Sequence, residues 1–219
     1  GGAWGDRDPV ARDCPRCSQR TGAETLAELL HAIRDGVREQ SATADVMAYD
    51  WGWGTPLAAA LIPRLPRDTS LISISEWAQP VSRGGVQTRV GEYSMSVVGP
   101  GPRANTNWAL ARKAGLRTIA KVQFNNTWEI SAVPYIPVLP LVLDHAERLA
   151  DAGIGGVMAS WTCGGYPSPN LRAAMAFGSR PRPSRDEVLQ REAIRLYGAA
   201  NAARAREAWA IFSDAFQSF

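Results

Sequence analysis

The segment Thr118-Ile-Ala-Lys-Val-Gln-Phe-Asn-Asn-Thr-Trp-Glu129 decides the fold class of this chain. Its first seven residues, 118–124, are rich in β-branched and aromatic side chains and predict a buried strand. We expect the strand to end at Asn125 and Asn126, because asparagines favour turns over strand interiors. Trp128 and Glu129 follow directly. A β/α barrel carries its chemistry at the carboxyl ends of its strands, where this pair would lie.

Three other predicted strands end in a similar way. Each is followed by tryptophan, and two of the three also by a carboxylate: residues 45–49 by Asp50, Trp51 and Trp53, residues 69–75 by Glu76 and Trp77, and residues 156–160 by Trp161. Aromatic faces stack on sugar rings, and carboxylates catalyse the cleavage of glycosidic bonds. The repetition favours a carbohydrate site at one edge of a parallel sheet.

Helices are predicted between and after these strands. Periodic apolar residues indicate helices at residues 21–40, 55–65, 105–115, 138–152 and 169–177, with two more after Ser184. Capping boxes are predicted at two of the helix starts, Thr21 with Glu24 and Ser184 with Glu187. A strand or hairpin is expected at residues 87–98. Strands that alternate with helices imply a parallel sheet with right-handed crossovers.

Four strand–helix units make half of an eightfold barrel. We therefore expect an α/β fold, namely the C-terminal half of a (β/α)8 TIM barrel (strands five to eight), followed by C-terminal helices. Residues 1–180 would form the partial barrel and residues 181–219 the helical segment. The alternative is a complete, open, doubly wound domain of four or five strands. That alternative does not explain why no glycine-rich phosphate loop follows the first predicted strand of this sequence.

Composition narrows the function classes. The 219 residues carry a net charge of +3 with scattered arginines, so nucleic acid is not an expected partner. No apolar stretch approaches the ~20 residues of a membrane span, so a membrane is not expected either. Eight tryptophans against two histidines favour sugar stacking over histidine-based metal chemistry. No cofactor is expected, and composition assigns no compartment.

The candidate site residues share a place near the ends of the predicted strands. Glu129 and Glu76 are the catalytic candidates, and the substrate-binding candidates are Asp50, Trp51, Trp53, Trp77, Tyr93, Asn125, Asn126, Trp128, Trp161 and Tyr166. A structural interpretation of the same residues is that the tryptophans cap the core, Asp50 caps a turn and the glutamates pair with arginines. Four such strand ends together favour a site.

Cys14 and Cys17 form a CxxC motif near the start of the chain. Half of a zinc site is one interpretation, but two more ligands would have to come from Cys163, His31 and His145. A redox pair is another, although no strand is predicted before the motif. The third is a loop whose thiols pack locally.

The residues also suggest a family. The run 125–170, NNTWEISAVPYIPVLPLVLDHAERLADAGIGGVMASWTCGGYPSPN, resembles bacterial proteins related to the family 20 β-hexosaminidases. The CPRC–helix–strand arrangement that ends in VMAYDWGW, residues 46–53, is similar to barrel domains of the family 163 type, which act on N-glycans. The resemblance implies a barrel hydrolase of glycosides, with N-acetylhexosaminides as the expected substrates.

Two departures from the family 20 pattern affect the expected chemistry. The adjacent Asp-Glu pair that the pattern places after the fourth strand is absent, so the general acid is expected upstream of Gly1. A Trp-x-Glu near the eighth strand is replaced by Trp161-Thr162-Cys163. A missing N-terminal half-barrel, or a partner chain, is expected to cover the open sheet edges.

Three hypotheses therefore come from the sequence. The leading one is a fragment of a glycoside hydrolase, in which the substrate acetamido group or Glu129 is the nucleophile. The second is a barrel that binds carbohydrate without cleaving it. The third is a zinc or redox domain centred on Cys14 and Cys17.

Overall fold

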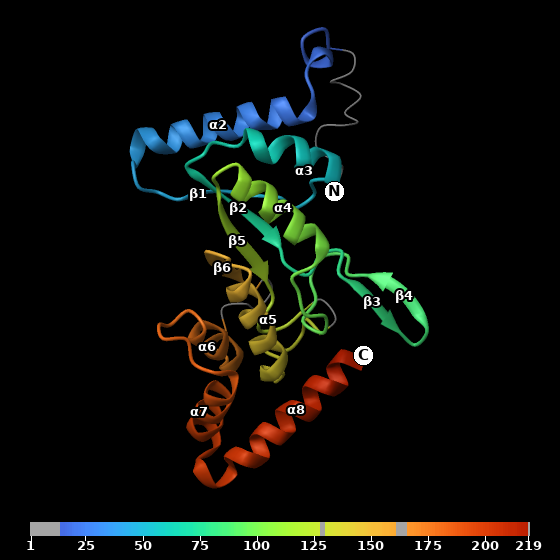
Figure 1. Cartoon of the computed structure of the whole chain (residues 1–219), viewed down its shortest axis with the longest axis vertical. Coiled ribbons are helices and arrows are strands. Elements are labelled where there is room, and N and C mark those ends of the chain that lie inside the picture. The colour runs from blue at the N-terminus through green and yellow to red at the C-terminus, as the bar shows by residue number, and fades with distance from the viewer. Residues whose placement is uncertain (1–13, 128–129, 161–165, 219) are drawn as a thin grey trace. The chain divides into compact units, whose positions relative to one another are not determined.

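The computed structural model describes residues 14–127, 130–160 and 166–218 (Figure 1). They form a mixed α/β structure with a four-stranded parallel sheet in the order β1-β2-β5-β6 and a separate two-stranded sheet, β3-β4. The strands of the larger sheet are β1 (Val46–Tyr49), β2 (Thr69–Ile74), β5 (Arg117–Val122) and β6 (Gly156–Ala159). All four lie where the sequence predicts a strand, so the α/β prediction is confirmed.

The helices also follow the predicted positions. They are α2 (Gly22–Gln40), α3 (Thr55–Leu61), α4 (Pro102–Lys113), α5 (Leu139–Asp151), α6 (Pro169–Ala176), α7 (Arg185–Tyr197) and α8 (Ala202–Ser218), with short 3-10 turns η1 (Cys17–Gln19), η2 (Ile62–Arg64) and η3 (Ala199–Asn201). Both predicted capping boxes are confirmed, Thr21 with Glu24 and Ser184 with Glu187. The helix predicted at 55–65 becomes a 3-10 turn after Leu61, where Pro63 lacks the amide hydrogen that a continuing α-helix needs.

The hairpin lies earlier in the chain than expected. β3 (Pro80–Arg83) pairs with β4 (Val86–Arg89), so residues 90–98 form no strand. The turn between the strands is Gly84-Gly85, and both glycines have positive φ, 54° and 79°. Two residues with positive φ make the tight turn whose twist matches a hairpin, and a Gly-Gly pair is a known signal for it.

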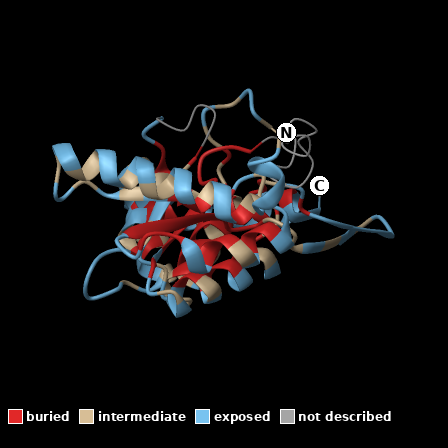
Figure 2. Ribbon diagram, turned by 90° about the horizontal axis from the view of Figure 1, so that it is seen from above, coloured by how far each residue is buried: buried red, intermediate tan, exposed pale blue. Residues whose placement is uncertain are grey.

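The chain divides into two compact units. The first contains residues 14–74 and 103–119, and its core is built around Leu61, Ile62 and Leu71. The second contains residues 75–102 and the described residues from 120 onward, and Val142 and Leu143 of α5 are part of its core. Figure 2 shows buried residues concentrated on the strands and exposed residues on the outer faces of the helices. The predicted boundary at residue 181 stays a prediction.

Candidate active site

The Glu76 carboxylate lies in the interior of the second unit, directly after Ser75 at the end of β2. Neither residue is exposed to solvent. His145 on α5 contacts both of them. Its Nε2 is 2.7 Å from Ser75 Oγ, and its Nδ1 is 3.6 Å from Glu76 Oε1. One imidazole ring therefore holds the side chains of two successive residues.

Burial determines the charge of His145. Together with a smaller effect of Arg148, burial lowers the pKa of His145 from 6.5 to about 3. The ring is therefore neutral near pH 7, and its contact with Glu76 is not an ion pair.

Ser75, His145 and Glu76 follow the order hydroxyl, imidazole and carboxylate of a hydrolase triad. The Ser75 hydroxyl is fully buried and packs directly beneath Gly99. A Cβ added to Gly99 would lie 2.6 Å from Ser75 Oγ and 2.9 Å from His145 Nε2, so the Gly99 backbone covers the pair. Ser75 and His145 therefore position Glu76 and do not supply a nucleophile.

Lys121 is a buried cation on β5. The side chain is 1% exposed, and its Nζ donates a hydrogen bond to the Ser160 carbonyl. Nζ also lies 5.4 Å from the centroid of the Tyr93 ring, within cation–π range. Burial lowers the pKa of Lys121 from 10.5 to about 8, and the Glu76 carboxylate acts in the opposite direction.

The predictions above did not include Lys121 as a site residue, although the sequence contains a signal for it. Only two of the 24 basic residues are lysines, Lys113 and Lys121, and the second interrupts an apolar strand. Arginine supplies nearly every other positive charge of the chain. Burial lowers the pKa of a lysine, so a lysine at such a position can lose its proton near neutral pH.

The segment after the hairpin holds Tyr93 in place. Arg83 of β3 donates hydrogen bonds to the carbonyl of Ser96, at 3.1 Å, and to its hydroxyl, at 3.0 Å. The hydroxyls of Ser94 and Ser96 are 3.0 Å apart. Tyr93 itself is buried, at 7% exposure. The ring of Tyr93 therefore lies beneath the Lys121 ammonium group, and its role in substrate binding stays a prediction.

Backbone strain occurs beside these groups. Ala78, four residues after the end of β2, has a φ of 65°, and Ser160, directly after β6, has a φ of 63°. This left-handed region is unfavourable for residues with a side chain and is enriched at functional sites. The carbonyl of Ser160 is the one that accepts the Lys121 hydrogen bond.

The predicted binding residues Asn125 and Asn126 are fully buried. The amide of Asn125 donates to the Tyr166 carbonyl at 2.9 Å and accepts a hydrogen bond from the Ser168 hydroxyl. The amide of Asn126 donates to the Val133 carbonyl at 3.0 Å. These bonds fold residues 131–136 and 166–168 around the end of β5, which is a structural role.

Some buried polar atoms near this strand end have no hydrogen-bond partner within the described residues. They are Gln123 Oε1, Asn126 Oδ1 and Ser160 Oγ. Side chains alternate along a strand, so Gln123 shares with Lys121 the face opposite to Phe124, whose ring contacts His145. Buried acceptors without a donor are unfavourable and are typical of sites completed by a ligand or water. Gln123 was not predicted from the sequence.

Asp50 belongs to a different cluster, in the first unit. Its carboxylate is fully buried and accepts hydrogen bonds from Ser73 Oγ at 2.6 Å and Asn107 Nδ2 at 2.7 Å. Arg103 forms an ion pair with it at 3.1 Å and also donates to the carbonyls of Asp50 and Trp53. This cluster attaches the loop after β1 to α4. Its contacts are those of a structural carboxylate.

The predicted aromatic residues have different environments. Trp51 is 47% exposed, whereas Trp53 packs against the core of the first unit. In the second unit, Trp77 is half-buried and Tyr166 is 45% exposed. Tyr166 stacks on Tyr135, with ring centroids 5.9 Å apart. The remaining predicted site residues, Trp128, Glu129 and Trp161, lie outside the described residues.

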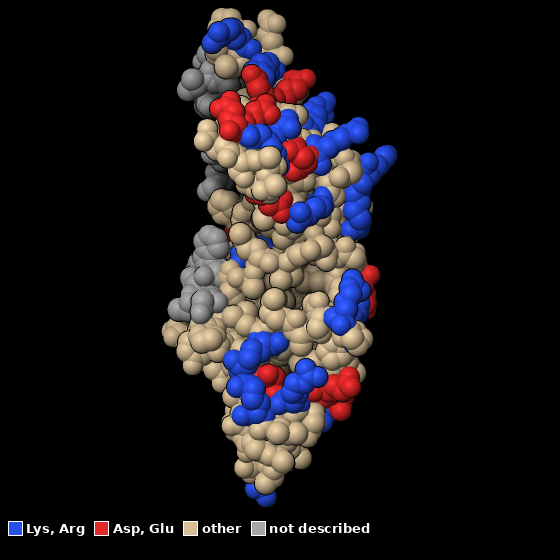
Figure 3. Space-filling model, turned by 90° about the vertical axis from the view of Figure 1, so that its left-hand side faces the viewer, with Lys and Arg blue, Asp and Glu red and all other residues tan. Residues whose placement is uncertain are grey.

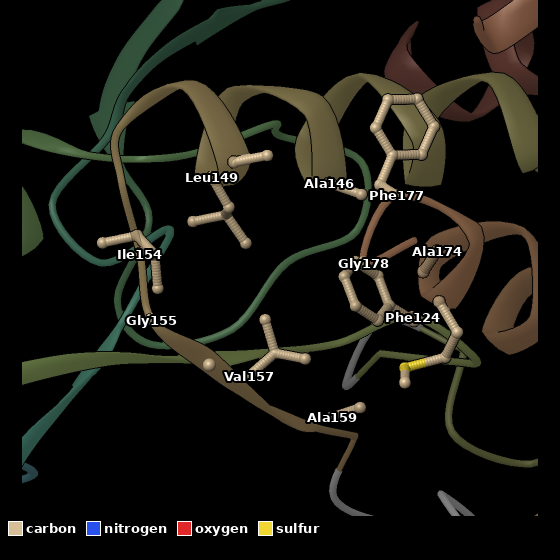
Figure 4. A pocket seen from close by; sticks show the side chains of 13 residues that line it. Phe124, Ala146, Leu149, Ile154, Gly155, Val157, Ala159, Ala174, Phe177 and Gly178 are labelled. Carbon is tan, nitrogen blue, oxygen red and sulfur yellow. The ribbon is translucent and has the colours of Figure 1, made fainter. Parts of the chain in front are cut away.

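An apolar pocket in the second unit lies between α5, β6 and α6 (Figure 4). Its volume is about 390 Å³, and its lining includes Phe124, Leu149, Val157 and Phe177 with several glycines and alanines. None of its lining side chains carries a charge or a hydrogen-bonding group. Acid–base chemistry therefore has no basis in this pocket.

Neither a cluster of metal-ligand side chains nor a membrane-spanning helix is found in the described part of the chain. It contains no group of three or more His, Cys, Asp or Glu side chains placed to hold a metal ion. Cys14 and Cys17 are free thiols, and Cys163 lies outside the described residues. None of the described helices is both long and apolar enough to cross a bilayer. On the face drawn in Figure 3, basic and acidic side chains lie close together.

Comparison with known proteins identifies no relative. No family model matches the chain, and no curated protein or solved structure matches it significantly.

Proposed function

We propose that this chain is part of a glycoside hydrolase that acts on N-acetylhexosaminides through carboxylates at the ends of parallel strands. The observation that carries the proposal is the burial of Glu76 and Lys121 in the same unit, where the carboxylate acts electrostatically on the amine. Two ionisable groups in an interior are expensive to maintain, and such pairs are concentrated at functional sites. The substrate class comes from the resemblance of residues 125–170 to the family 20 β-hexosaminidases.

The surroundings of Glu76 favour a role as an ionised carboxylate. The Glu76 carboxylate favours the protonated, positively charged form of Lys121. An ionised carboxylate stabilises the positive charge that develops on the sugar ring, or attacks it. Glu129 is the second carboxylate candidate of this chain, and the expected nucleophile is Glu129 or the acetamido group of the substrate. Retaining glycosidases place the two groups ~5 Å apart and inverting ones ~6.5–9.5 Å apart.

Two features support a half-barrel, strands five to eight, as the setting. The sheet order β1-β2-β5-β6 follows the order of the chain, whereas a doubly wound sheet reverses direction at a switch point. The edge strands also leave apolar side chains exposed, Met47 on β1 at 45%, and Val157 and Met158 on β6 at 41% and 46%. Further strands of the same barrel, from a preceding segment or a partner chain, would cover them.

A barrel that binds sugars without cleaving them is the second candidate. The exposed rings of Trp51 and Tyr166, at 47% and 45%, favour it, because an aromatic face can stack on a sugar ring. Aryl N-acetyl-β-hexosaminides distinguish the two functions. Release of the aryl alcohol in proportion to enzyme concentration supports hydrolysis, whereas saturable binding with no release supports the second candidate. Neither release nor binding would refute both.

A further inference from the structure

The second unit also contains a groove whose lining includes neither Glu76 nor Lys121. Its volume is about 430 Å³, and its lining comes from the segment before α5, the end of α7, η3 and α8: Tyr135, Pro137, Tyr197, Asn201, Arg204, Ala205, Ala208, Trp209 and Phe212. Figure 1 shows α7 and α8 meeting at a tight turn. A groove of this size is suited to one or two sugar rings.

Helical spacing explains the shape of this groove. Arg204, Ala208 and Phe212 follow one another at four-residue intervals on α8, and Ala205 and Trp209 do the same beside them. The two alanines leave space, and the larger side chains form walls around it. The lining therefore combines a small-residue floor with aromatic sides.

The aromatic walls are held by their own contacts. Trp209 is 3% exposed and lies 6.1 Å from Tyr197 between ring centroids. Tyr135 is held on its other side by the stacked ring of Tyr166. Burial, with Tyr197 and Tyr166 nearby, raises the pKa of Tyr135, so its hydroxyl stays neutral at physiological pH. Rigid aromatic faces bind a ligand with little loss of conformational entropy.

The charge in the groove comes from Arg204. It is the one charged residue in the lining as described, and no carboxylate accompanies it there. Three other arginines of α7 and α8 form ion pairs: Arg185 with Asp144 and Glu147, Arg195 with Glu192, and Arg206 with Asp186. Arg204 has no such pair within the described residues. A guanidinium beside aromatic walls matches a ligand with an apolar ring face and a carboxylate.

We propose that this groove binds an acidic sugar, a hexuronic acid unit of a glycan, with its ring against Tyr135 and the exposed ring of Phe212 and its carboxylate on Arg204. A neutral sugar would leave the guanidinium unused, and an apolar protein segment would bury it without a partner. The site is separate from the proposed hydrolytic site, so it stands even where Glu76 has no catalytic role.

Calorimetric titration of the whole chain with a glucuronic-acid disaccharide and with its methyl ester tests the proposal. The methyl ester has the same sugar rings as the acid but lacks the negative charge of its carboxylate. We expect the acid to bind at least about tenfold more tightly than the ester, because a charge-assisted hydrogen bond is lost in the ester. Arg204→Gln should abolish this difference. Arg191→Gln, which removes an exposed charge of α7 outside the groove, should preserve it.

Phe212→Ala should weaken the binding of acid and ester alike, whereas Ile211→Ala, at the neighbouring exposed position, should weaken neither. Equal affinity for acid and ester, no binding of either, or equal effects of Arg204→Gln and Arg191→Gln would overturn the proposal. Self-association of the chain that disappears in Phe212→Ala would assign the groove to a second copy and overturn it as well.

Discussion

The ammonium group of Lys121 lies over the ring of Tyr93, with Nζ 5.4 Å from the ring centroid, inside a unit that leaves the lysine 1% exposed. The ring provides electrostatic attraction without a full negative charge, and Glu76 provides the charge. The balance between burial and these two partners sets the pKa of Lys121, that is, the pH at which it loses its proton.

The first prediction concerns the titration of Lys121. Labelling of the lysine side chains gives two NMR signals, because the chain has two lysines. We expect the signal of Lys121 to titrate with a pKa of about 8. Glu76→Gln should lower the pKa of Lys121 further, because the carboxylate favours the protonated amine. An unchanged Lys121 titration in Glu76→Gln would contradict the pairing.

The same group contributes to stability in a defined pH window. The unfolded chain holds the Lys121 proton more tightly than the folded chain does. The free energy of unfolding therefore increases as pH rises from about 8 towards 10.5. Lys121→Met should remove this gain, and urea denaturation at pH 8 and pH 10 measures it. A stability slope in Lys121→Met equal to that of the parent would argue against a buried ammonium.

The third prediction uses the two histidines of the chain. The folded-state pKa of His145, about 3, is below its ordinary value of 6.5, so stability is lost as pH falls from 6.5 towards 3. His145→Gln should reduce the difference in unfolding free energy between pH 7 and pH 4.5. His31→Gln is the matched control, because His31 is only partly buried, and it should keep the difference. Equal behaviour of the two variants would refute the assignment.

Gly99 provides a test of the contact above Ser75. Gly99→Ala places a methyl group 2.6 Å from Ser75 Oγ, so we expect a destabilisation of about 1–3 kcal/mol from overpacking. Gly36→Ala in α2 meets nothing within 4 Å and should stabilise by roughly 0.5–1 kcal/mol, because alanine is the better helix former. Chemical denaturation measures both. A neutral or stabilising Gly99→Ala would show that the Ser75–His145 pair is not covered.

The Asp50 cluster predicts a purely structural effect. Arg103→Met leaves a buried carboxylate without its cation and should cost about 3–5 kcal/mol. Arg117→Met removes the ion pair with Asp45 from a side chain that is 65% exposed and should cost less than about 1 kcal/mol. If the two changes cost the same in urea denaturation, the Asp50 cluster does not anchor the loop after β1.

Much of the fold could be predicted from the sequence because its signals are local. The strand at 118–124 and the capping boxes at Thr21 and Ser184 depend on neighbouring residues, and each lies where expected. The hairpin expected at residues 87–98 lies instead at residues 80–89, on either side of the Gly84-Gly85 turn. The Gly-Gly pair is itself a local signal for such a turn, because both of its residues have positive φ there.

The site was less predictable because it depends on contacts between distant segments. Glu76 was identified by its place after a strand, but its partners His145 and Lys121 come from α5 and β5. Asp50 has the same sequence pattern as Glu76, a carboxylate before tryptophan, yet three side chains engage its carboxylate. Pattern alone cannot separate these two carboxylates, because their difference lies in tertiary burial and charge pairing.

The most direct test of the proposed function compares two glutamates that differ in burial. Glu76 is fully buried, whereas Glu39 is exposed on α2. With an aryl N-acetyl-β-hexosaminide as substrate, Glu76→Gln should lower kcat/KM by about a hundredfold to ten-thousandfold, the range for loss of a catalytic carboxylate. Glu39→Gln should leave kcat/KM unchanged. Hydrolysis by Glu76→Gln at the rate of the parent would contradict the account.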